Sequence, residues 1–329
     1  MAATGRHATS GRHGGRCGRQ VLLAAALLLA AQLAPAATSV LFIGNSFTFG
    51  YGSAVRYYRA ASVRDLNDEG QGGVPALFKS FTQQAGLDYD VALETRGGTG
   101  IDWHVANRAD LLRRQPWDVV VAHGYSTLDA EHPGNPAKLV ESVQQLAALL
   151  RGVNSQVDLR LEATFPRADQ AYTATGAWRG KSVADMAHDV RAGYELAAKA
   201  SPAVHGIIPV GEAWIRAFDA GIADRNPYDG IDAGKLDLWT FDNYHASVAG
   251  YYLKGLVVFG ALTGRDPRTL GGGECSGFEL GLSVPQVKAL QQVAFEQLAA
   301  SERPRAAPAL ATGAAPGDEP QRCRPAGAH

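Results

Sequence analysis

The chain has 329 residues, of which 46% are hydrophobic and 19% are charged. This length and apolar content allow a sizeable buried core, so one α/β domain is the expected organisation. The formal net charge is −1, and the chain lacks the basic excess that is typical of proteins that bind nucleic acids or acidic lipids. We therefore expect no nucleic-acid partner.

The N-terminus has the pattern of a secretory signal peptide over residues 1–36. Arginines within residues 6–19 precede a Leu- and Ala-rich stretch at 21–34, and Ala-Pro-Ala at 34–36 matches a cleavage site. The apolar stretch is shorter than the about 20 residues that span a bilayer, although a retained anchor helix is the alternative. We expect cleavage before Ala37, a secreted or periplasmic protein, and no stable membrane anchor.

Beyond the signal peptide, apolar runs alternate with helical patterns. The predicted strands are 39–43, 89–94, 117–122, 157–163 and 206–210. The predicted helices are 74–85, 105–113, 137–150, 183–200, 211–220, 247–262, with Ser247 as the cap, and 284–300. Strands that are apolar on both faces suit a parallel sheet covered by helices. The sequence therefore predicts a three-layer α/β/α domain over 37–301, with a central parallel sheet of about five strands.

Two segments do not fit this alternation. Residues 49–73 form a long, polar, Gly-rich insertion that follows Ser46 closely, and we expect this insertion to shape the site or to act as a lid. Residues 302–329 are rich in Ala, Pro, Gly and charge, and we expect them to be a disordered tail.

The cysteines bear on the tail. Cys17 would leave with the signal peptide, whereas Cys275 and Cys323 would stay in the mature chain. Two cysteines in an exported protein favour a disulfide, here between Cys275 and Cys323, and the alternative is two unpaired thiols.

Two short strings carry the residues of a nucleophilic site. Gly44-Asn45-Ser46 follows the first predicted strand, and a small residue before the serine permits a tight turn. Asp242 lies three residues before His245, ahead of a long apolar helix, and an aspartate that orients a histidine makes it a base for a serine. Taken alone, each string is also compatible with an ordinary turn or helix cap.

An acyl-transfer site also needs hydrogen-bond donors for the oxyanion that forms on the substrate. The backbone N–H of Ser46 and that of Gly98 are the first candidates, and His123 marks a third position. Ser46, Gly98 and His123 each come just after a predicted strand, and ligand sites of α/β folds lie at the carboxyl ends of the strands.

These strings resemble the conserved blocks of the SGNH/GDSL hydrolase family of serine esterases, over about residues 39–270. Gly44-Asn45-Ser46 is similar to the first block, Gly98 to the second-block glycine, and Asp242 with His245 to the fifth block. The resemblance implies a flavodoxin-like fold, with no metal and no organic cofactor. The third block of the family usually supplies an Asn side chain to the oxyanion. This chain has His123 there, which we expect either to donate from its ring or to line the pocket.

The sequence thus predicts a secreted serine hydrolase that cleaves carboxylic esters, with Ser46 as nucleophile, His245 as base and Asp242 as the group that orients the base. We expect Asn45, Tyr51 and Tyr125 to contact the substrate. By analogy with the family, the expected substrate is an acetylated carbohydrate, and a small-molecule or lipid ester is the next candidate. The alternatives are a lipase-like esterase and a catalytically silent glycan-binding module of the same fold.

Overall fold

The computed structural model describes residues 1–8 and 36–301. It divides the chain into two units, Met1–Ala36 and Ala37–His329, and the described helices and strands all belong to the second. Most of the predicted signal peptide, the predicted tail and Cys323 lie outside the described residues. Among the described helices, none is both long enough and apolar enough to cross a membrane.

The centre of the second unit is a parallel sheet with the strand order β2-β3-β1-β4-β5-β6. The strands are β1 (Thr38–Gly44), β2 (Arg64–Asp65), β3 (Tyr89–Thr95), β4 (Val119–Ala122), β5 (Asp158–Ala163) and β6 (Val204–Pro209). The five predicted strands are all present, and the sixth is the two-residue β2 inside the predicted insertion. Without β2, the order of the other five is that of flavodoxin-like folds, so the predicted fold class is confirmed.

The strand β1 shows why the sheet is covered on both sides. Val40 and Phe42 belong to the hydrophobic core on one face of the sheet, while Leu41 and Ile43 belong to the core on the other face. All four are at most 2% exposed. Because successive side chains of a strand point to opposite faces, a strand that is apolar at every position must be buried on both.

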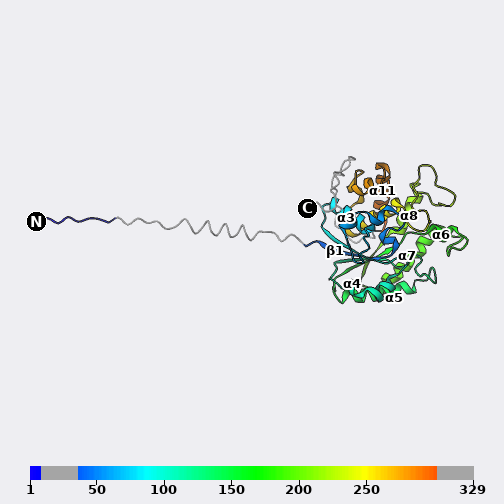
Figure 1. Cartoon of the computed structure of the whole chain (residues 1–329), viewed down its shortest axis with the longest axis horizontal. Helices are drawn as coiled ribbons and strands as arrows, with labels where there is room; N and C mark the ends of the chain where they lie inside the picture. Colours follow the sequence, from blue (N-terminus) through cyan, green and yellow to red (C-terminus); the bar gives the residue numbers. More distant parts are fainter. Residues whose placement is uncertain (9–35, 302–329) are drawn as a thin grey trace. The chain divides into compact units, whose positions relative to one another are not determined.

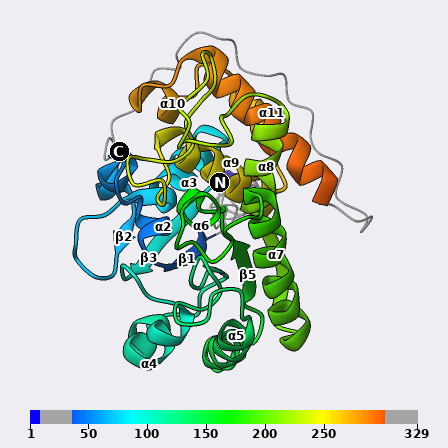
Figure 2. The same ribbon diagram turned by 90° about the vertical axis from the view of Figure 1, so that its right-hand side faces the viewer.

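Helices cover the two faces in separate layers (Figures 1 and 2). One layer consists of α3 (Gly73–Gln84), α8 (Val210–Asp219), α9 (Val248–Thr263) and α11 (Val284–Ser301). The other layer consists of α4 (Ile101–Leu112), α5 (Ala137–Arg151) and α7 (Val183–Ala200). The sequence predicted each of these helices, and Ser247 caps α9 by accepting a hydrogen bond from the Gly250 N–H.

Several short elements were not predicted. They are the helices α2 (Ser46–Phe49), α6 (Ala168–Tyr172) and α10 (Cys275–Glu279), and the 3₁₀ turns η1 (Ala54–Tyr57), η2 (Ala60–Ser62) and η3 (Pro267–Leu270). An element of one turn is too short to show a 3.6-residue period. Of these, α2 and η1 determine the geometry of the site, because they lie just beyond the carboxyl end of β1.

Candidate active site

The turn that carries Ser46 begins directly after β1. Asn45 caps α2, with its side-chain oxygen accepting a hydrogen bond from the Phe47 N–H at 3.0 Å. A Cβ atom at Gly44 would lie 2.3 Å from the Thr48 side chain and 2.4 Å from the His123 ring. The turn therefore needs glycine because side chains approach it closely, and the sequence had suggested only that glycine permits a tight bend.

The loop before α9 brings the predicted base and its orienting carboxylate together. The His245 Nδ1–H donates to Asp242 Oδ2 at 2.6 Å, and Asp242 Oδ1 accepts the backbone N–H groups of Tyr244 and His245 at 3.0 and 2.9 Å. Asn243, between them, has a φ of 53°, a left-handed conformation that Asn tolerates better than most residues. The Thr240 N–H donates to the His245 carbonyl at 2.8 Å and closes the loop.

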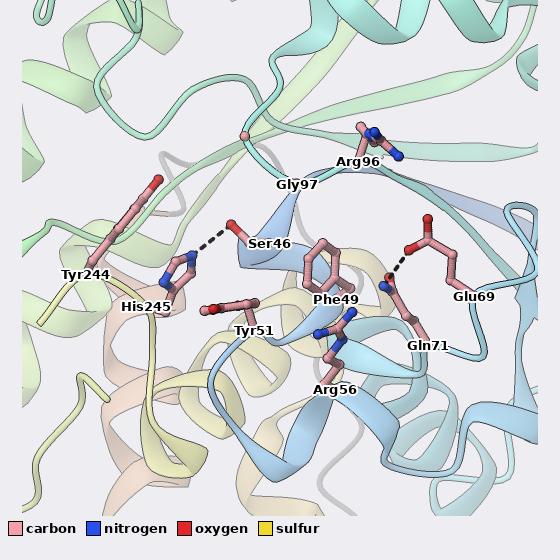
Figure 3. A pocket seen from close by; sticks show the side chains of 11 residues that line it. Ser46, Phe49, Tyr51, Arg56, Glu69, Gln71, Arg96, Gly97, Tyr244 and His245 are labelled. Atoms are coloured by element: carbon pink, nitrogen blue, oxygen red, sulfur yellow. Dashed lines mark hydrogen bonds between the residues drawn. The ribbon is translucent and has the colours of Figure 1, made fainter. Parts of the chain in front are cut away.

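The fold joins the two strings. The second ring nitrogen of His245, Nε2, lies 2.9 Å from Ser46 Oγ, although the residues are 199 positions apart in sequence (Figure 3). The Tyr244 ring stacks on the His245 ring at 4.1 Å between centroids, and the Tyr51 ring lies 4.6 Å away. These rings restrict the imidazole to an orientation in which one nitrogen faces the carboxylate and the other faces the serine.

The electrostatics of the pair favour a neutral base. Burial lowers the pKa of His245 and outweighs the opposing effect of Asp242, so the pKa lies below its ordinary value of 6.5. Burial raises the pKa of Asp242, but the hydrogen bonds from His245 and Tyr244 together exceed this effect and hold the pKa below its usual value. At neutral pH, Asp242 is therefore charged and His245 is free to accept a proton.

Helix α9 also supports the serine turn from below. The Tyr251 hydroxyl donates to the Ser46 carbonyl at 3.1 Å, and Lys254 Nζ donates to the Phe47 carbonyl at 2.8 Å. Lys254 pairs with Glu162 at 2.6 Å, and both side chains are almost completely buried. Burial lowers the pKa of Lys254 and raises that of Glu162, while each group opposes the shift of the other. The sequence does not reveal this pair, because a single lysine in an apolar helix has the pattern of a surface residue.

The loop after β3 places Gly98 at the same edge of the sheet. Gly98 has a φ of 73°. The Asn45 side chain donates from Nδ2 to the Thr99 carbonyl in this loop at 2.9 Å and to the Gly124 carbonyl after β4 at 3.3 Å, so it connects the two loops to the serine turn. Among the described residues, no backbone carbonyl accepts the N–H of Ser46 or of Gly98. The role predicted for Asn45 is corrected accordingly: its side-chain atoms bond the chain itself, and the residue does not line the pocket.

The structure also disagrees with the donor role predicted for His123. The ring is 1% exposed, its Nε2 lies 2.7 Å from the Thr48 hydroxyl, and its Nδ1 lies 3.0 Å from the Gly124 carbonyl. Burial and the charge of Lys254 hold the pKa of His123 well below its usual range. The neutral ring thus donates to Gly124 and accepts from Thr48, and it has no N–H left for an oxyanion.

Tyr125 is the third prediction that the structure corrects. Its ring packs against Gly100, where a Cβ atom would lie 2.4 Å from the tyrosine, and Lys138 lies 5.8 Å from the ring centre. Tyr125 does not line the pocket, whereas Tyr51 does. The Tyr125 ring thus packs on the N-cap residue of α4.

A pocket of about 450 Å³ opens at the serine. The residues that line it are Ser46, Phe49, Tyr51, Arg56, Glu69, Gln71, Arg96, Gly97, Gly98, Tyr244 and His245 (Figure 3). The predicted insertion at 49–73 contributes nearly half of this wall, which fits the expectation that the insertion shapes the site. Nothing in the sequence indicates that Arg56, Glu69 and Gln71 line the pocket, since side-chain direction in an irregular segment follows no period.

The described residues contain one cluster that combines three possible metal ligands, namely Asp129, Glu131 and His132, with ligand atoms within 4.8 Å of one another. Two of the three are exposed, and none lines the pocket. Cys275 is disulfide-bonded, and its predicted partner Cys323 lies outside the described residues.

Comparison with known proteins supports the fold. No family model and no curated protein matches the sequence. Among solved structures, a DUF4886 family protein from Bacteroides uniformis is similar, with 19% identity and a TM-score of 0.57 over 79% of this chain and 94% of that chain. A putative SGNH hydrolase from Slackia heliotrinireducens has 22% identity and a TM-score of 0.47 over 69% of this chain and 99% of that chain.

A family 3 carbohydrate esterase from Clostridium thermocellum has 16% identity and a TM-score of 0.44, covering 68% of this chain and 93% of its own. At such identities, the likeness to the Bacteroides uniformis protein shows a shared fold. A putative SGNH hydrolase is thus among the solved structures to which this chain is similar.

Proposed function

We propose that this chain is a serine hydrolase that cleaves carboxylic esters. The observation that carries the proposal is the continuous arrangement of Asp242, His245 and Ser46, with separations of 2.6 and 2.9 Å, at the mouth of a pocket. A binding module needs neither a serine within reach of a neutral histidine nor a carboxylate that fixes the histidine's tautomer. An acyl-transfer enzyme needs both.

In the proposed reaction, Ser46 Oγ attacks the ester carbonyl carbon while His245 Nε2 takes the hydroxyl proton. The tetrahedral intermediate collapses when the bond to the alcohol oxygen breaks, and His245 returns the proton to that oxygen. Water, deprotonated by His245, then attacks the acyl-enzyme. The bond between the acyl carbon and Ser46 Oγ breaks, His245 returns the proton to Oγ, and the carboxylic acid leaves. Throughout, Asp242 holds the Nδ1–H and stabilises the imidazolium that forms.

The developing oxyanion would be bound by the backbone N–H groups of Ser46 and Gly98, which have no backbone acceptor among the described residues. Both belong to residues that line the pocket. Because His123 is already bonded on both nitrogens, we propose an oxyanion site made of backbone donors alone. Such donors are pre-organised by the fold and need no rearrangement during the reaction.

For the substrate, we propose an acylated carbohydrate outside the cytoplasm, which fits the N-terminal pattern of a signal peptide. Tyr51 is 40% exposed and stands beside His245 at the pocket mouth, where a sugar ring can pack on its face. A lipase-like activity on lipid esters is the second candidate within the same chemistry, and the size of the acyl group separates the two.

The test is hydrolysis of p-nitrophenyl acetate and p-nitrophenyl butyrate by the chain from Ala37 onward. We expect activity in the wild type and its loss in Ser46→Ala and in His245→Ala, with unchanged circular dichroism. The ratio of acetate to butyrate turnover gives the size of the acyl site. Equal rates in the wild type and both variants would refute the enzyme and favour the silent glycan-binding module.

A further inference from the structure

The pocket beside Ser46 contains two arginines that the proposed reaction does not use. Arg56 comes from η1, within the predicted insertion, and Arg96 comes from the loop after β3. Figure 3 shows them on either side of Phe49, on the side of Ser46 away from His245. A guanidinium in a pocket is the usual means by which proteins bind carboxylates, because its planar N–H groups match the two oxygens.

Arg56 is held firmly in place. Its backbone N–H donates to the Ser53 carbonyl at 3.1 Å, and its carbonyl accepts the Gly72 N–H at 2.8 Å. The guanidinium lies 5.0 Å from the centre of the Phe49 ring and 5.2 Å from that of the Tyr57 ring. Its Nε atom is buried and has no hydrogen-bond partner among the described residues. A buried donor without an acceptor is costly, so an anionic group that accepted a hydrogen bond from this atom would be favoured in the pocket.

Arg96 is positioned from the other side of the pocket. Its backbone N–H donates to the Gly44 carbonyl at 3.0 Å, which continues the pairing of β1 and β3, and its guanidinium lies 5.9 Å from the Trp103 ring centre. The side chain is exposed and borders the entrance. Together, Arg56 and Arg96 present one inner and one outer cation to a molecule bound at Ser46.

The charge around the two arginines is not balanced by the chain. Glu69 is the carboxylate among the residues that line the pocket, and it accepts a hydrogen bond from Gln71 at 2.8 Å. Neither arginine forms an ion pair with a carboxylate of the described residues. By contrast, Arg59 of the same insertion is paired at 2.6 Å with Glu279 of α10, so another part of the fold supplies a carboxylate partner to that arginine.

We propose that the pocket takes anionic esters, in which a carboxylate of the substrate binds Arg56 and Arg96 while the ester carbonyl lies at Ser46. This inference rests on the proposed esterase activity and names its substrate class. The carboxylate has two possible sources, the acyl group, as in half-esters of dicarboxylic acids, or the alcohol, as in an acetylated sugar acid. The chemistry of recognition is the same for both.

The experiment measures kcat and KM for two matched pairs of esters by titration of the released acid. Monoethyl succinate against ethyl levulinate tests a carboxylate on the acyl side, and acetylated galacturonic acid against acetylated galactose tests one on the alcohol side. We expect the acid to exceed its neutral partner in kcat/KM by about 10- to 100-fold in one pair, mainly through KM, as is typical of a hydrogen-bonded charge. The pair that shows this preference identifies the source.

Variants assign the preference to the arginines. Arg56→Gln and Arg96→Gln should each lower the acid-to-neutral ratio about tenfold, and Arg56→Lys should retain part of it because the charge stays. Arg114→Gln is the matched control, since Arg114 is exposed and does not line the pocket; it should leave the ratio unchanged. Raising the salt concentration should weaken the preference in the wild type.

The inference is overturned if both neutral esters are hydrolysed as well as the acids, or if the ratio survives both glutamine substitutions. Hydrolysis of p-nitrophenyl acetate that depends on Ser46 would then still support the esterase. Absence of Ser46-dependent hydrolysis of p-nitrophenyl acetate and of all four esters would instead refute the proposed function itself, so the two failures are distinguishable.

Discussion

Two histidines of this chain each lie between a carboxylate and a hydroxyl group. His245 connects Asp242 to Ser46 at the pocket. His104, in α4, bonds Glu94 of β3 through Nδ1, and its Nε2 lies 3.3 Å from the Thr99 hydroxyl. The first histidine faces the pocket, whereas His104 and Glu94 are both 0% exposed.

The difference shows that three residue types in the right order do not make a reactive site. The Thr99 hydroxyl donates its hydrogen bond to the Arg96 carbonyl at 2.8 Å, so His104 does not take up the Thr99 proton. Because His104 and Glu94 are fully buried, neither can reach a substrate. The His104 set joins β3, α4 and the loop between them that carries Gly98. We therefore interpret the His104 set as support for the loop and the His245 set as the reactive one.

Removing the hydroxyl group from each set should separate them most strongly. Ser46→Ala should reduce kcat/KM for p-nitrophenyl acetate by at least about 10⁴-fold, because the nucleophile is gone. Thr99→Ala should reduce it by less than about tenfold, because only a loop contact is lost. Comparable losses in both variants, with both folded by circular dichroism, would contradict the assignment.

Neutralising the Asp242 carboxylate should reduce mainly the activity, whereas neutralising the Glu94 carboxylate should reduce mainly the stability. Asp242→Asn should lower kcat by about 10³- to 10⁴-fold, since the amide favours the wrong tautomer of His245, with little change in thermal unfolding. Glu94→Gln should instead lower the free energy of unfolding by about 1–3 kcal/mol, because a buried hydrogen-bonding group loses its match. The measurements are unfolding in urea and turnover for both variants. A large loss of stability in Asp242→Asn together with a large loss of kcat in Glu94→Gln would contradict the assignment.

Breaking the buried Lys254–Glu162 pair, which lies next to the serine turn, should have an intermediate effect, on stability. Lys254→Met should cost about 3–5 kcal/mol of stability, because Glu162 is left buried without a counter-charge. Lys254→Met combined with Glu162→Leu should regain most of that loss, although the turn would still lack the donor to the Phe47 carbonyl. A double variant that is as unstable as the single one would show that the charge pairing is not the cause.

The smallest expected effect is on pH dependence. His245 acts as a base only when neutral, and burial lowers its pKa below 6.5. Activity should therefore be full near pH 7 and fall as the pH drops through a midpoint below 6.5, where the ring gains its proton. The measurement is kcat/KM against pH, with fluorescence as a control for folding. A midpoint above 6.5 would contradict the direction of the shift.

The contrast between the two histidine sets also shows what the sequence can reveal. Asp242 and His245 are close in the chain, so their contact needs only one loop, and Ser46 follows a strand that a continuous apolar run makes evident. The long helices and the five main strands were predictable for the same local reasons. The two-residue β2 was not, because it is held by its pairing with β3 rather than by a pattern of its own.

The remaining parts of the site depend on tertiary packing. The direction of the Asn45 and His123 side chains is set by neighbours such as Thr48 and Gly124, which the sequence does not place. The same holds for Arg56, whose position follows from the packing of the insertion on Phe49. For Asn45 and His123, residue type and strand position predict a location at the carboxyl edge of the sheet, but they do not predict which atoms each side chain contacts.

The position of helix α9 late in the chain determines when, during synthesis, the site can assemble. The serine turn is made early in synthesis, but the loop that holds His245 and the helix that supplies Tyr251 and Lys254 belong to the last third of the chain. A growing polypeptide consequently carries Ser46 without the histidine that contacts its hydroxyl until residue 245 has been added. If the proposed function holds, a chain that ends before His245 should not hydrolyse esters, and activity should arise only when the domain is nearly complete.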